Sequence, residues 1–344
     1  KKTITKCKSF YVSRFDGEFN SSLVVDSWYK KSLWLYLLYP FALAVSYFTG
    51  RKRRKFLKNS LKKYKSEVPI IIVGNLTIGG TGKTPLVKYI ATELIKLGYK
   101  PGIVSRGYGG KFKETLRVTN ETPVKQTGDE AQILSTLNIP FYIDKNRVRA
   151  LKTLNDNHDC DVIISDDGLQ HYNMNRDVEI VVIDGKRRFG NNLSFPAGPL
   201  RESLKRLDSV DFIVNNSGPT EDGEHLMNVS PAKFIHLKSG KSYSVEDWPM
   251  HKQVHAVAGL GNPGRFFDLL ARLGFDITRN PFPDHHNFIS EDVHYLDHLP
   301  IIMTEKDASK CKDFDNNKIW YLTIEAEVSS KFMEKLDSKL KNLS

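Results

Sequence analysis

Short apolar runs alternate with longer amphipathic segments from Val68 onward. The runs are rich in Val and Ile and are too continuous for strands with one solvated face, which is typical of strands buried in a parallel sheet. They lie at residues 68–73, 102–105, 140–143, 161–165, 179–184 and 211–216. Helices are expected between them, at 84–97, about 128–137 and 146–157. This alternation predicts an α/β fold, a doubly wound parallel sheet with helices on both faces.

A second alternating set follows after about residue 250. Its apolar runs lie at 254–259, 300–304 and 318–324, and its helices are expected at 265–273 and 327–342. Between the two sets, at 217–252, Gly, Ser, Pro and charged residues replace the apolar runs, as at a domain boundary. We therefore expect a core domain at 67–225 and a smaller second α/β domain at 226–344.

Residues 27–66 form a basic and apolar segment that differs from both domains. An aromatic-rich stretch of 18 residues, Ser32–Thr49, lies between Lys30-Lys31 and the cluster Arg51–Lys55. Such flanks suit an element bound to anionic lipid headgroups. A crossing needs about 20 residues, and Pro40 interrupts the stretch, so a helix in the membrane plane is favoured over a crossing helix. A buried helix with a solvated basic flank is the third interpretation.

The positive charge of the chain is confined to its N-terminal region. The formal charge is +11, and the first 67 residues contain 16 Lys and Arg against 4 Asp and Glu, whereas the rest contains 35 against 36. This distribution argues against a nucleic-acid-binding face on the folded domains. The cysteines Cys7, Cys160 and Cys311 are odd in number and far apart, which fits a reducing compartment. Residues 1–26 carry no readable motif, no secretion signal is expected, and no oligomeric state is indicated.

A glycine-rich turn lies between the first apolar run and the first helix. The sequence GxxxxGK[ST] of phosphate-binding loops is matched except at Thr77, which stands where the first glycine is usual. Glycines between a strand and a helix start let backbone N–H groups converge on phosphate oxygens. We expect Lys83 to reach the β- and γ-phosphates and the Thr84 hydroxyl to bind Mg²⁺. The expected nucleotide-binding residues are Thr77, Ile78, Gly79, Gly80, Thr81, Gly82, Lys83 and Thr84.

Two adjacent carboxylates follow a later strand. Asp166 and Asp167 end the apolar run 161–165, and phosphate-loop enzymes hold their metal with a carboxylate at the end of a nearby strand. Neighbouring carboxylates repel one another unless a cation compensates them. The sequence thus predicts a P-loop NTPase-type site that uses ATP and Mg²⁺.

Eight motifs in order resemble those of the tetraacyldisaccharide 4'-kinase family, the lipid A 4'-kinases of Gram-negative bacteria. The resemblance runs from about Trp28 to the C-terminus. The motifs are GNLTIGGTGKTP (74–85), SRGYGG (105–110), GDE (128–130), DDGLQH (166–171), PAGPLRE (196–202), GNPGRF (261–266), DHHNF (284–288) and TEKDASK (304–310). The resemblance implies phosphorylation, with MgATP, of the 4'-hydroxyl of a tetraacylated glucosamine disaccharide 1-phosphate. It also implies a location on the cytoplasmic face of the inner membrane, docked through the N-terminal helix.

The resemblance also implies roles for single residues. Asp129 is expected to accept the proton of the acceptor hydroxyl, oriented by His285 or His286, between which the sequence does not decide. Glu202 is expected to complete the metal site, with Arg201 close to the transferred phosphate. The expected substrate contacts or supporting residues are Arg106, Tyr108, Gln170 and His171.

Other readings of the glycine-rich turns remain. A membrane-associated partitioning or targeting ATPase would carry Lys before the glycine pair of its loop, where this chain has Ile78. A scaffold that binds nucleotide without turnover is a further alternative. The turn at Gly259–Gly264 matches GxGxxG of dinucleotide-binding proteins, but Pro263 lies inside it and no acidic residue closes a following strand.

Overall fold

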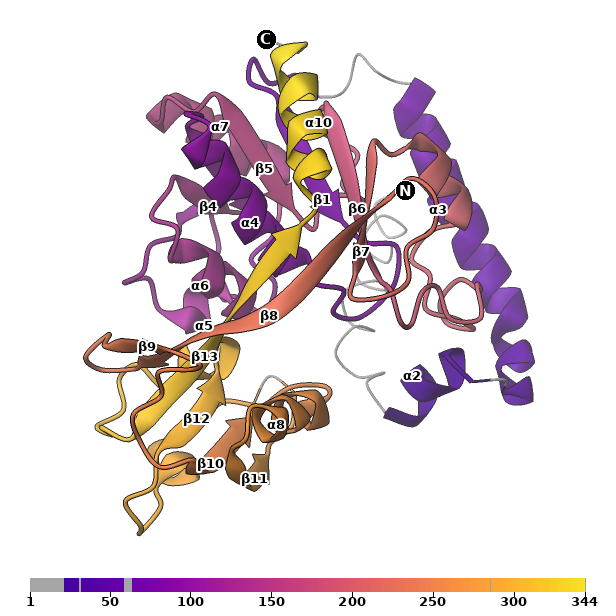
Figure 1. Cartoon of the computed structure of the whole chain (residues 1–344). Coiled ribbons are helices and arrows are strands. Elements are labelled where there is room, and N and C mark those ends of the chain that lie inside the picture. The colour runs from indigo at the N-terminus through magenta and orange to yellow at the C-terminus, as the bar shows by residue number, and fades with distance from the viewer. Residues whose placement is uncertain (1–21, 31, 59–63, 285, 344) are drawn as a thin grey trace.

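A single sheet of 13 strands runs through the whole of the computed structural model, which describes residues 22–30, 32–58, 64–284 and 286–343 (Figure 1). The strand order is β11-β10-β12-β13-β8-β7-β6-β1-β5-β2-β4-β3, with β9 paired to β8. The expected α/β fold is confirmed.

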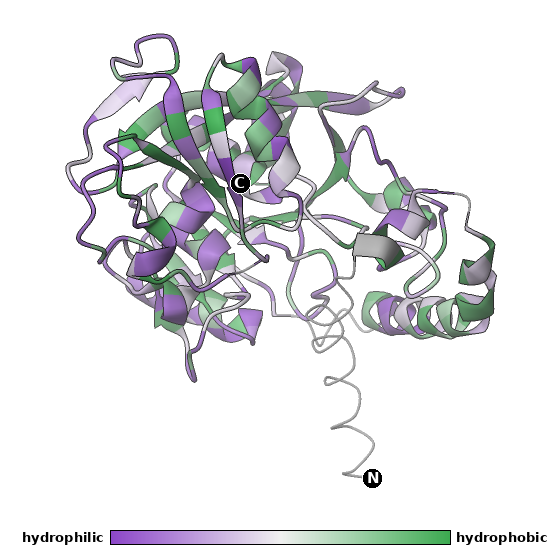
Figure 2. Cartoon of the chain, turned by 90° about the horizontal axis from the view of Figure 1, so that it is seen from below, coloured by the Kyte–Doolittle hydropathy of each residue, from purple (hydrophilic) through white to green (hydrophobic). Residues whose placement is uncertain are grey.

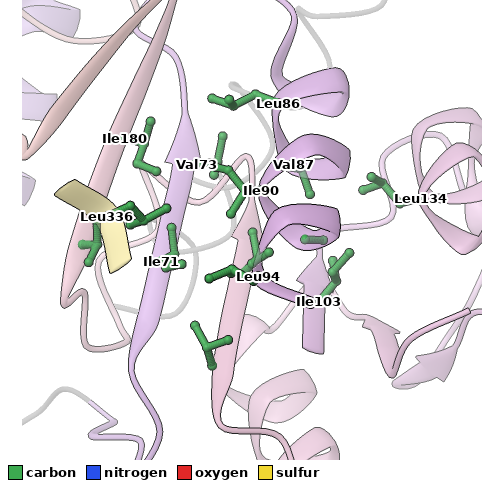
Figure 3. Packing of buried hydrophobic residues seen from close by; sticks show 14 of the residues in the cluster. Ile71, Val73, Leu86, Val87, Ile90, Leu94, Ile103, Leu134, Ile180 and Leu336 are labelled. Atoms are coloured by element: carbon green, nitrogen blue, oxygen red, sulfur yellow. The ribbon is translucent and has the colours of Figure 1, made fainter. Parts of the chain in front are cut away.

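The N-terminal half is built on parallel strands buried on both faces. Its parallel strands are β1 (Ile70–Gly74), β2 (Pro101–Ser105), β4 (Phe141–Ile143), β5 (Val162–Asp166), β6 (Val178–Asp184) and β7 (Phe212–Asn216). Ile71 and Val73 pack toward helix α4 (Lys83–Lys96), as Figure 3 shows. Ile70 and Ile72 face the opposite side, where α7 (Arg147–Asn157) packs. The short elements β3 (Leu116–Arg117), α5 (Val124–Thr127), α6 (Asp129–Ser135) and η3 (Leu204–Ser209) complete this half.

The C-terminal half continues the sheet. Strands β10 (Gln253–Ala258), β11 (Asp276–Pro281) and β12 (Ile301–Thr304) are parallel to one another, and β12 is parallel to β13 (Ile319–Val328). Its remaining elements are β9 (Ser242–Ser244), α8 (Pro263–Arg272), η4 (Ser290–Val293) and α9 (Glu305–Ala308). Two separate apolar clusters stabilise this half, one on each face of its strands.

A long antiparallel pair joins the halves. Strand β8 (Glu224–His236) pairs with β7 on one edge and with β13 on the other, and it crosses from one half to the other in Figure 1. The stretch 217–252, where the sequence predicts a boundary, therefore carries a strand common to both halves. Helix α10 (Ser330–Lys341) returns to the N-terminal half, where Phe332 and Leu336 join the core beneath α4.

Three N-terminal elements lie along one side of this core: α2 (Ser22–Trp28), η1 (Leu33–Leu38) and α3 (Tyr39–Lys58). The stretch Leu33–Lys58 is long and apolar enough to cross a membrane. However, one stripe of α3 packs on the core: Arg53 donates to Ser209 Oγ at 2.7 Å, and the Phe56 ring stacks on Tyr172. In Figure 2 the helix at the right-hand edge of the molecule carries many residues coloured as hydrophobic. The exposed apolar side chains of η1 and α3 are Leu33, Trp34, Tyr36, Leu37, Tyr39, Phe41, Leu43, Tyr47, Phe48 and Leu57.

Candidate active site

The glycine-rich turn links the end of β1 to the start of α4, as the sequence predicts. Gly79 and Gly82 have φ values of 107° and 95°, a region that favours glycine. A Cβ at Gly82 would lie 2.5 Å from Asn216 Nδ2, and this same amide donates to the Thr81 carbonyl at 3.0 Å. The turn is therefore closed against the end of β7, and only glycine fits at position 82.

The segment Pro196–Glu202 pins the first part of the turn. Ile78 N–H donates to the Pro199 carbonyl at 2.8 Å, and Arg201 N–H donates to the Leu76 carbonyl at 2.7 Å. Thr77 forms a bridge with Leu200 and is buried. Because extended pairing needs no special φ, a non-glycine residue fits at position 77, which is where the sequence departs from the usual pattern.

Asp166 and Asp167 lie at the carboxyl end of β5, opposite the turn. Lys83 Nζ is 3.4 Å from one oxygen of Asp167, and Arg201 Nη1 is 3.5 Å from the other. Burial alone would raise the pKa of Asp167, but the charges of Lys83, Arg201 and Arg147 outweigh burial and hold it well below its usual range. The structure thus brings together the phosphate-loop lysine, the acid pair and Arg201.

Arg147 is a member of this cluster that sequence reasoning missed. Its guanidinium is buried and donates to the carbonyls of Asp166 and Asp167 at 2.6 and 3.2 Å. The only signal in the sequence is its place at the start of a helix that follows a strand. By holding both carbonyls, Arg147 fixes the backbone that presents the two carboxylates.

The acid pair has the chemistry of a magnesium site. Asp166 Oδ1 is buried and has no hydrogen-bond partner, while Ser105 Oγ donates to the other oxygen at 3.3 Å. Burial, followed by the charges of Glu130 and Asp167, raises the pKa of Asp166, and the charges of Lys83 and Arg147 offset this only in part. Mg²⁺ is commonly held by one or two carboxylates together with substrate phosphates. Asp166, Asp167 and the Thr84 hydroxyl at the start of α4 fit that pattern.

The structure does not bring Glu202 to the acid pair. Its carboxylate accepts from the Tyr172 hydroxyl at 2.8 and 2.7 Å, and Arg206 Nε lies 3.8 Å away. Among the residues described, no group of three or more His, Cys, Asp and Glu could hold a metal. Glu202 instead belongs to a buried polar cluster beneath α3. Arg53 of α3 lines the same small cavity as Glu202.

Asp129 begins helix α6, directly after a glycine turn. Gly128 has a φ of 84°, and a Cβ there would lie 2.0 Å from the Tyr108 carbonyl, so the GDE and SRGYGG motifs fit each other through this glycine. The neighbouring Glu130 acts electrostatically on Asp166. The start of α6 therefore lies near the acid pair at the carboxyl end of β5.

Two lysines of the C-terminal half reach Asp129. Lys310 Nζ and Lys306 Nζ lie 3.3 and 3.6 Å from Asp129 Oδ2. Sequence reasoning gave these lysines no role, although their spacing of four within TEKDASK was a usable signal. The His286 ring pairs with Asp292 at 2.8 Å, and the His286 carbonyl accepts from Lys310 at 3.2 Å. His285 lies outside the described residues.

Of the remaining expected residues, His171 is under the influence of several nearby cations. Burial, and then the charges of Arg147, Lys52, Arg176 and Arg106, lower the pKa of His171 to about 3. Its ring is neutral at neutral pH, and the buried Nε2 has no hydrogen-bond partner.

Gln170 and Tyr108 differ in their surroundings. Gln170 donates to the Asn75 carbonyl at 3.0 Å and so supports the phosphate-binding turn. Tyr108 is exposed at the rim. In the competing GxGxxG turn, the Gly259 N–H donates to Asp307 at 2.9 Å, so this N–H is already bonded within the protein.

Comparisons with known proteins point to one family. The family model described as "Tetraacyldisaccharide-1-P 4'-kinase" matches residues 34–341. Tetraacyldisaccharide 4'-kinase of Ruthia magnifica is 46% identical over 284 residues, covering 82% of this chain and 90% of that protein. The Psychromonas ingrahamii protein of the same name is 42% identical, covering 92% and 98%. A crystal structure of "apo" form LpxK from Aquifex aeolicus in complex with ATP superposes with a TM-score of 0.77 at 26% identity, covering 90% and 99%.

Proposed function

Because the chain belongs to the tetraacyldisaccharide-1-phosphate 4'-kinase family, we propose the part that each site residue plays in its reaction. The enzyme transfers phosphate from ATP to the 4'-hydroxyl of a tetraacylated disaccharide 1-phosphate, a step of lipid A biosynthesis. The observation that carries the assignment is the cluster of Lys83, Asp167 and Arg201 at the mouth of the phosphate-binding turn.

The turn and its two cations bind the nucleotide phosphates. Lys83 and Arg201 are paired with Asp167 in this structure. A bound triphosphate carries more negative charge than one carboxylate and replaces Asp167 as their partner. Asp167 is then available, with Asp166 and Thr84, to hold Mg²⁺. When bound, Mg²⁺ neutralises charge on the β- and γ-phosphate oxygens. Residues 79–82 contribute backbone N–H groups to the same phosphates, whereas the Ile78 N–H is already bonded to the Pro199 carbonyl.

Asp129 is the base in this proposal. The 4'-oxygen attacks the γ-phosphorus, the bond to the β–γ bridging oxygen breaks, and the hydroxyl proton passes to the Asp129 carboxylate. Asp129 belongs to the proposed core domain 67–225, whereas His285 and His286, either of which may be tested as its orienting partner, belong to the proposed domain 226–344.

The cations near His171 are suited to the anionic part of the acceptor. Lys52 extends from α3, and its charge and that of Arg106 both act on His171. A phosphate bound there is placed between the membrane-facing helix and the acid pair. We assign Arg106 and Tyr108 to acceptor contact. Gln170 is assigned to support of the phosphate-binding turn, and His171 to support of the cations near it.

Helix α3 lies in the membrane surface on the cytoplasmic face of the inner membrane in this proposal. Its packed stripe extends along the helix from Ala42 to Phe56, about 21 Å at 1.5 Å per residue. A crossing helix would have to leave these contacts or take the core into the bilayer. The exposed face is apolar in its first half and basic in the second half, which suits acyl chains and anionic headgroups.

A transfer assay tests the assignment. Purified protein with MgATP labelled in the γ-phosphate is expected to label the disaccharide 1-phosphate. Lys83→Ala and Asp129→Asn should each reduce kcat by about 10³-fold or more, because both remove interactions made with the reacting groups, while circular dichroism stays unchanged. ATP hydrolysis without label in the lipid would favour the targeting-ATPase alternative, and equal labelling by both variants would refute the assignment.

A further inference from the structure

The two lysines that approach Asp129 come from a different part of the chain. Asp129 starts α6 in the N-terminal half, whereas Lys306 lies in α9 and Lys310 just past its end, in the C-terminal half. Both ammonium groups meet the same oxygen, Asp129 Oδ2, at 3.6 and 3.3 Å. A spacing of four residues places both lysines on one side of the helical turn.

The surroundings hold Lys310 in place. Its amine contacts Asp307 Oδ1 at 3.6 Å and donates to the His286 carbonyl at 3.2 Å, and its side chain is only 8% exposed. Asp307 is itself fully buried and accepts from Gly259 N–H and from the Thr304 hydroxyl at 2.9 and 2.7 Å. The position of the Lys310 amine is therefore set by the sheet of the C-terminal half.

Lys306 is held between two carboxylates. Its Nζ lies 3.3 Å from Asp284 Oδ1 as well as 3.6 Å from Asp129. Asp284 opens the DHHNF motif, so Lys306 links Asp129 to the loop that carries the histidines. Neither lysine belongs to a phosphate-binding or metal-binding motif of the sequence, and the reaction described above uses neither.

We propose that Lys306 and Lys310 are positioning residues that hold the Asp129 carboxylate, from the C-terminal half, in the place and in the ionised form needed to accept the hydroxyl proton. This inference rests on the proposed role of Asp129 as the base. Among the described residues, Lys306 and Lys310 contact Asp129, Asp284 and Asp307 contact these lysines, and Glu130 is the next residue in the chain. The two ammonium groups are the positive members of this set, and they oppose three negative ones.

The acid limb of the kcat/KM profile tests the inference. Lys306→Met keeps the aliphatic stem and removes one charge, and an opposite charge within about 4–6 Å typically favours the ionised carboxylate by one or more pH units. We expect the acid limb to move about 1 unit to higher pH and kcat to fall about tenfold or more through misplacement of the base, with KM for ATP unchanged. Lys306→Arg, which keeps the charge, should leave the limb at the wild-type position.

Lys312→Met is the matched control. Lys312 Nζ also reaches across to the N-terminal half, where it donates to the Asn120 carbonyl at 3.3 Å, but it does not contact Asp129. This variant should keep the wild-type limb and rate. Because Lys310→Met also uncovers buried Asp307, its melting temperature is expected to fall, so Lys306→Met carries the main comparison.

Two outcomes separate this inference from the assignment beneath it. If Asp129→Asn is inactive but Lys306→Met leaves the acid limb in place, the lysines are structural contacts only and the inference fails. If Asp129→Asn keeps the wild-type rate and acid limb, the base has been assigned wrongly and the proposed role of Asp129 fails first. A limb that moves equally in Lys306→Met and Lys312→Met would also overturn the inference, because the effect would be general.

Discussion

Asp167 shows how burial and charge compete at a single residue. A carboxylate in an enclosed position is costly unless cations compensate it, and here Lys83 and Arg201 contact its two oxygens. In the proposed reaction, nucleotide and metal replace these partners without leaving an uncompensated charge, because the lysine and arginine exchange one anion for another while the carboxylate exchanges one cation for another. In this proposal, the ion pairs therefore keep Lys83, Arg201 and Asp167 charged and in place before the substrate binds.

His171 leads to a prediction about acid stability. Its folded-state pKa is about 3 because of burial and the nearby cations, whereas an unfolded histidine titrates near 6.5. Between these values the unfolded state binds a proton that the folded state does not, so the free energy of unfolding falls as pH decreases. His171→Gln should reduce this slope by up to about 1.4 kcal/mol per pH unit, measured by urea unfolding between pH 6.5 and 4.

His298→Gln provides the comparison, because His298 is exposed and its replacement should leave the slope as in the wild type. Equal slopes in all three proteins would mean that His171 takes up its proton normally in the folded state.

The elements that the sequence predicted well are those with local signals. β1, the glycine-rich turn and α4 follow from a Val- and Ile-rich run, glycines and an amphipathic pattern that lie within 30 residues of one another. Arg147, Lys306 and Lys310 received no role from the sequence, because their partners are distant in the chain and charged residues on short helices are usually solvated; the spacing of the two lysines was a signal of their shared side, not of their partner. Glu202 shows the converse, since its place in a motif beside Arg201 gave no indication that its side chain turns toward Tyr172 and α3.

Helix α3 allows the membrane arrangement to be tested. Phe41 and Phe48 are exposed by 64% and 61%, and burial of such a side chain contributes about 1.5–3 kcal/mol. Phe41→Ser and Phe48→Ser should each weaken binding to vesicles containing anionic lipid by about tenfold or more, measured by co-sedimentation, with ATP binding unchanged.

Leu296 is the control for this surface, because it is 95% exposed but lies in the C-terminal half. Leu296→Ser should leave vesicle binding intact. Resistance of the wild-type protein to extraction from membranes by alkaline carbonate would contradict the in-plane arrangement and favour a crossing helix.

At the scale of the whole molecule, helix α10 at the C-terminal end of the described chain packs against the N-terminal half. The sheet passes without interruption from one half to the other, and α10 carries residues from the C-terminus into the core that supports the phosphate-binding turn. Figure 1 shows this helix beside β1, far from β10 and β11. The nucleotide site and the lysines that reach Asp129 are thus joined both by β8 with β13 and by the packing of α10.

The shared sheet and the packing of α10 predict that the two halves lose stability together. Leu336 is fully buried in the core cluster of the N-terminal half, and Leu336→Ala should cost about 2–5 kcal/mol. Because β8 and β13 belong to both halves, hydrogen exchange should become faster by a similar factor in β1 and in β10 under conditions of global unfolding. Lys335→Ala, at the exposed neighbouring position, should change neither. Faster exchange in β1 with unchanged protection in β10 would show instead that the halves unfold separately, and the domains expected at 67–225 and 226–344 would then be independent folding units despite their shared sheet.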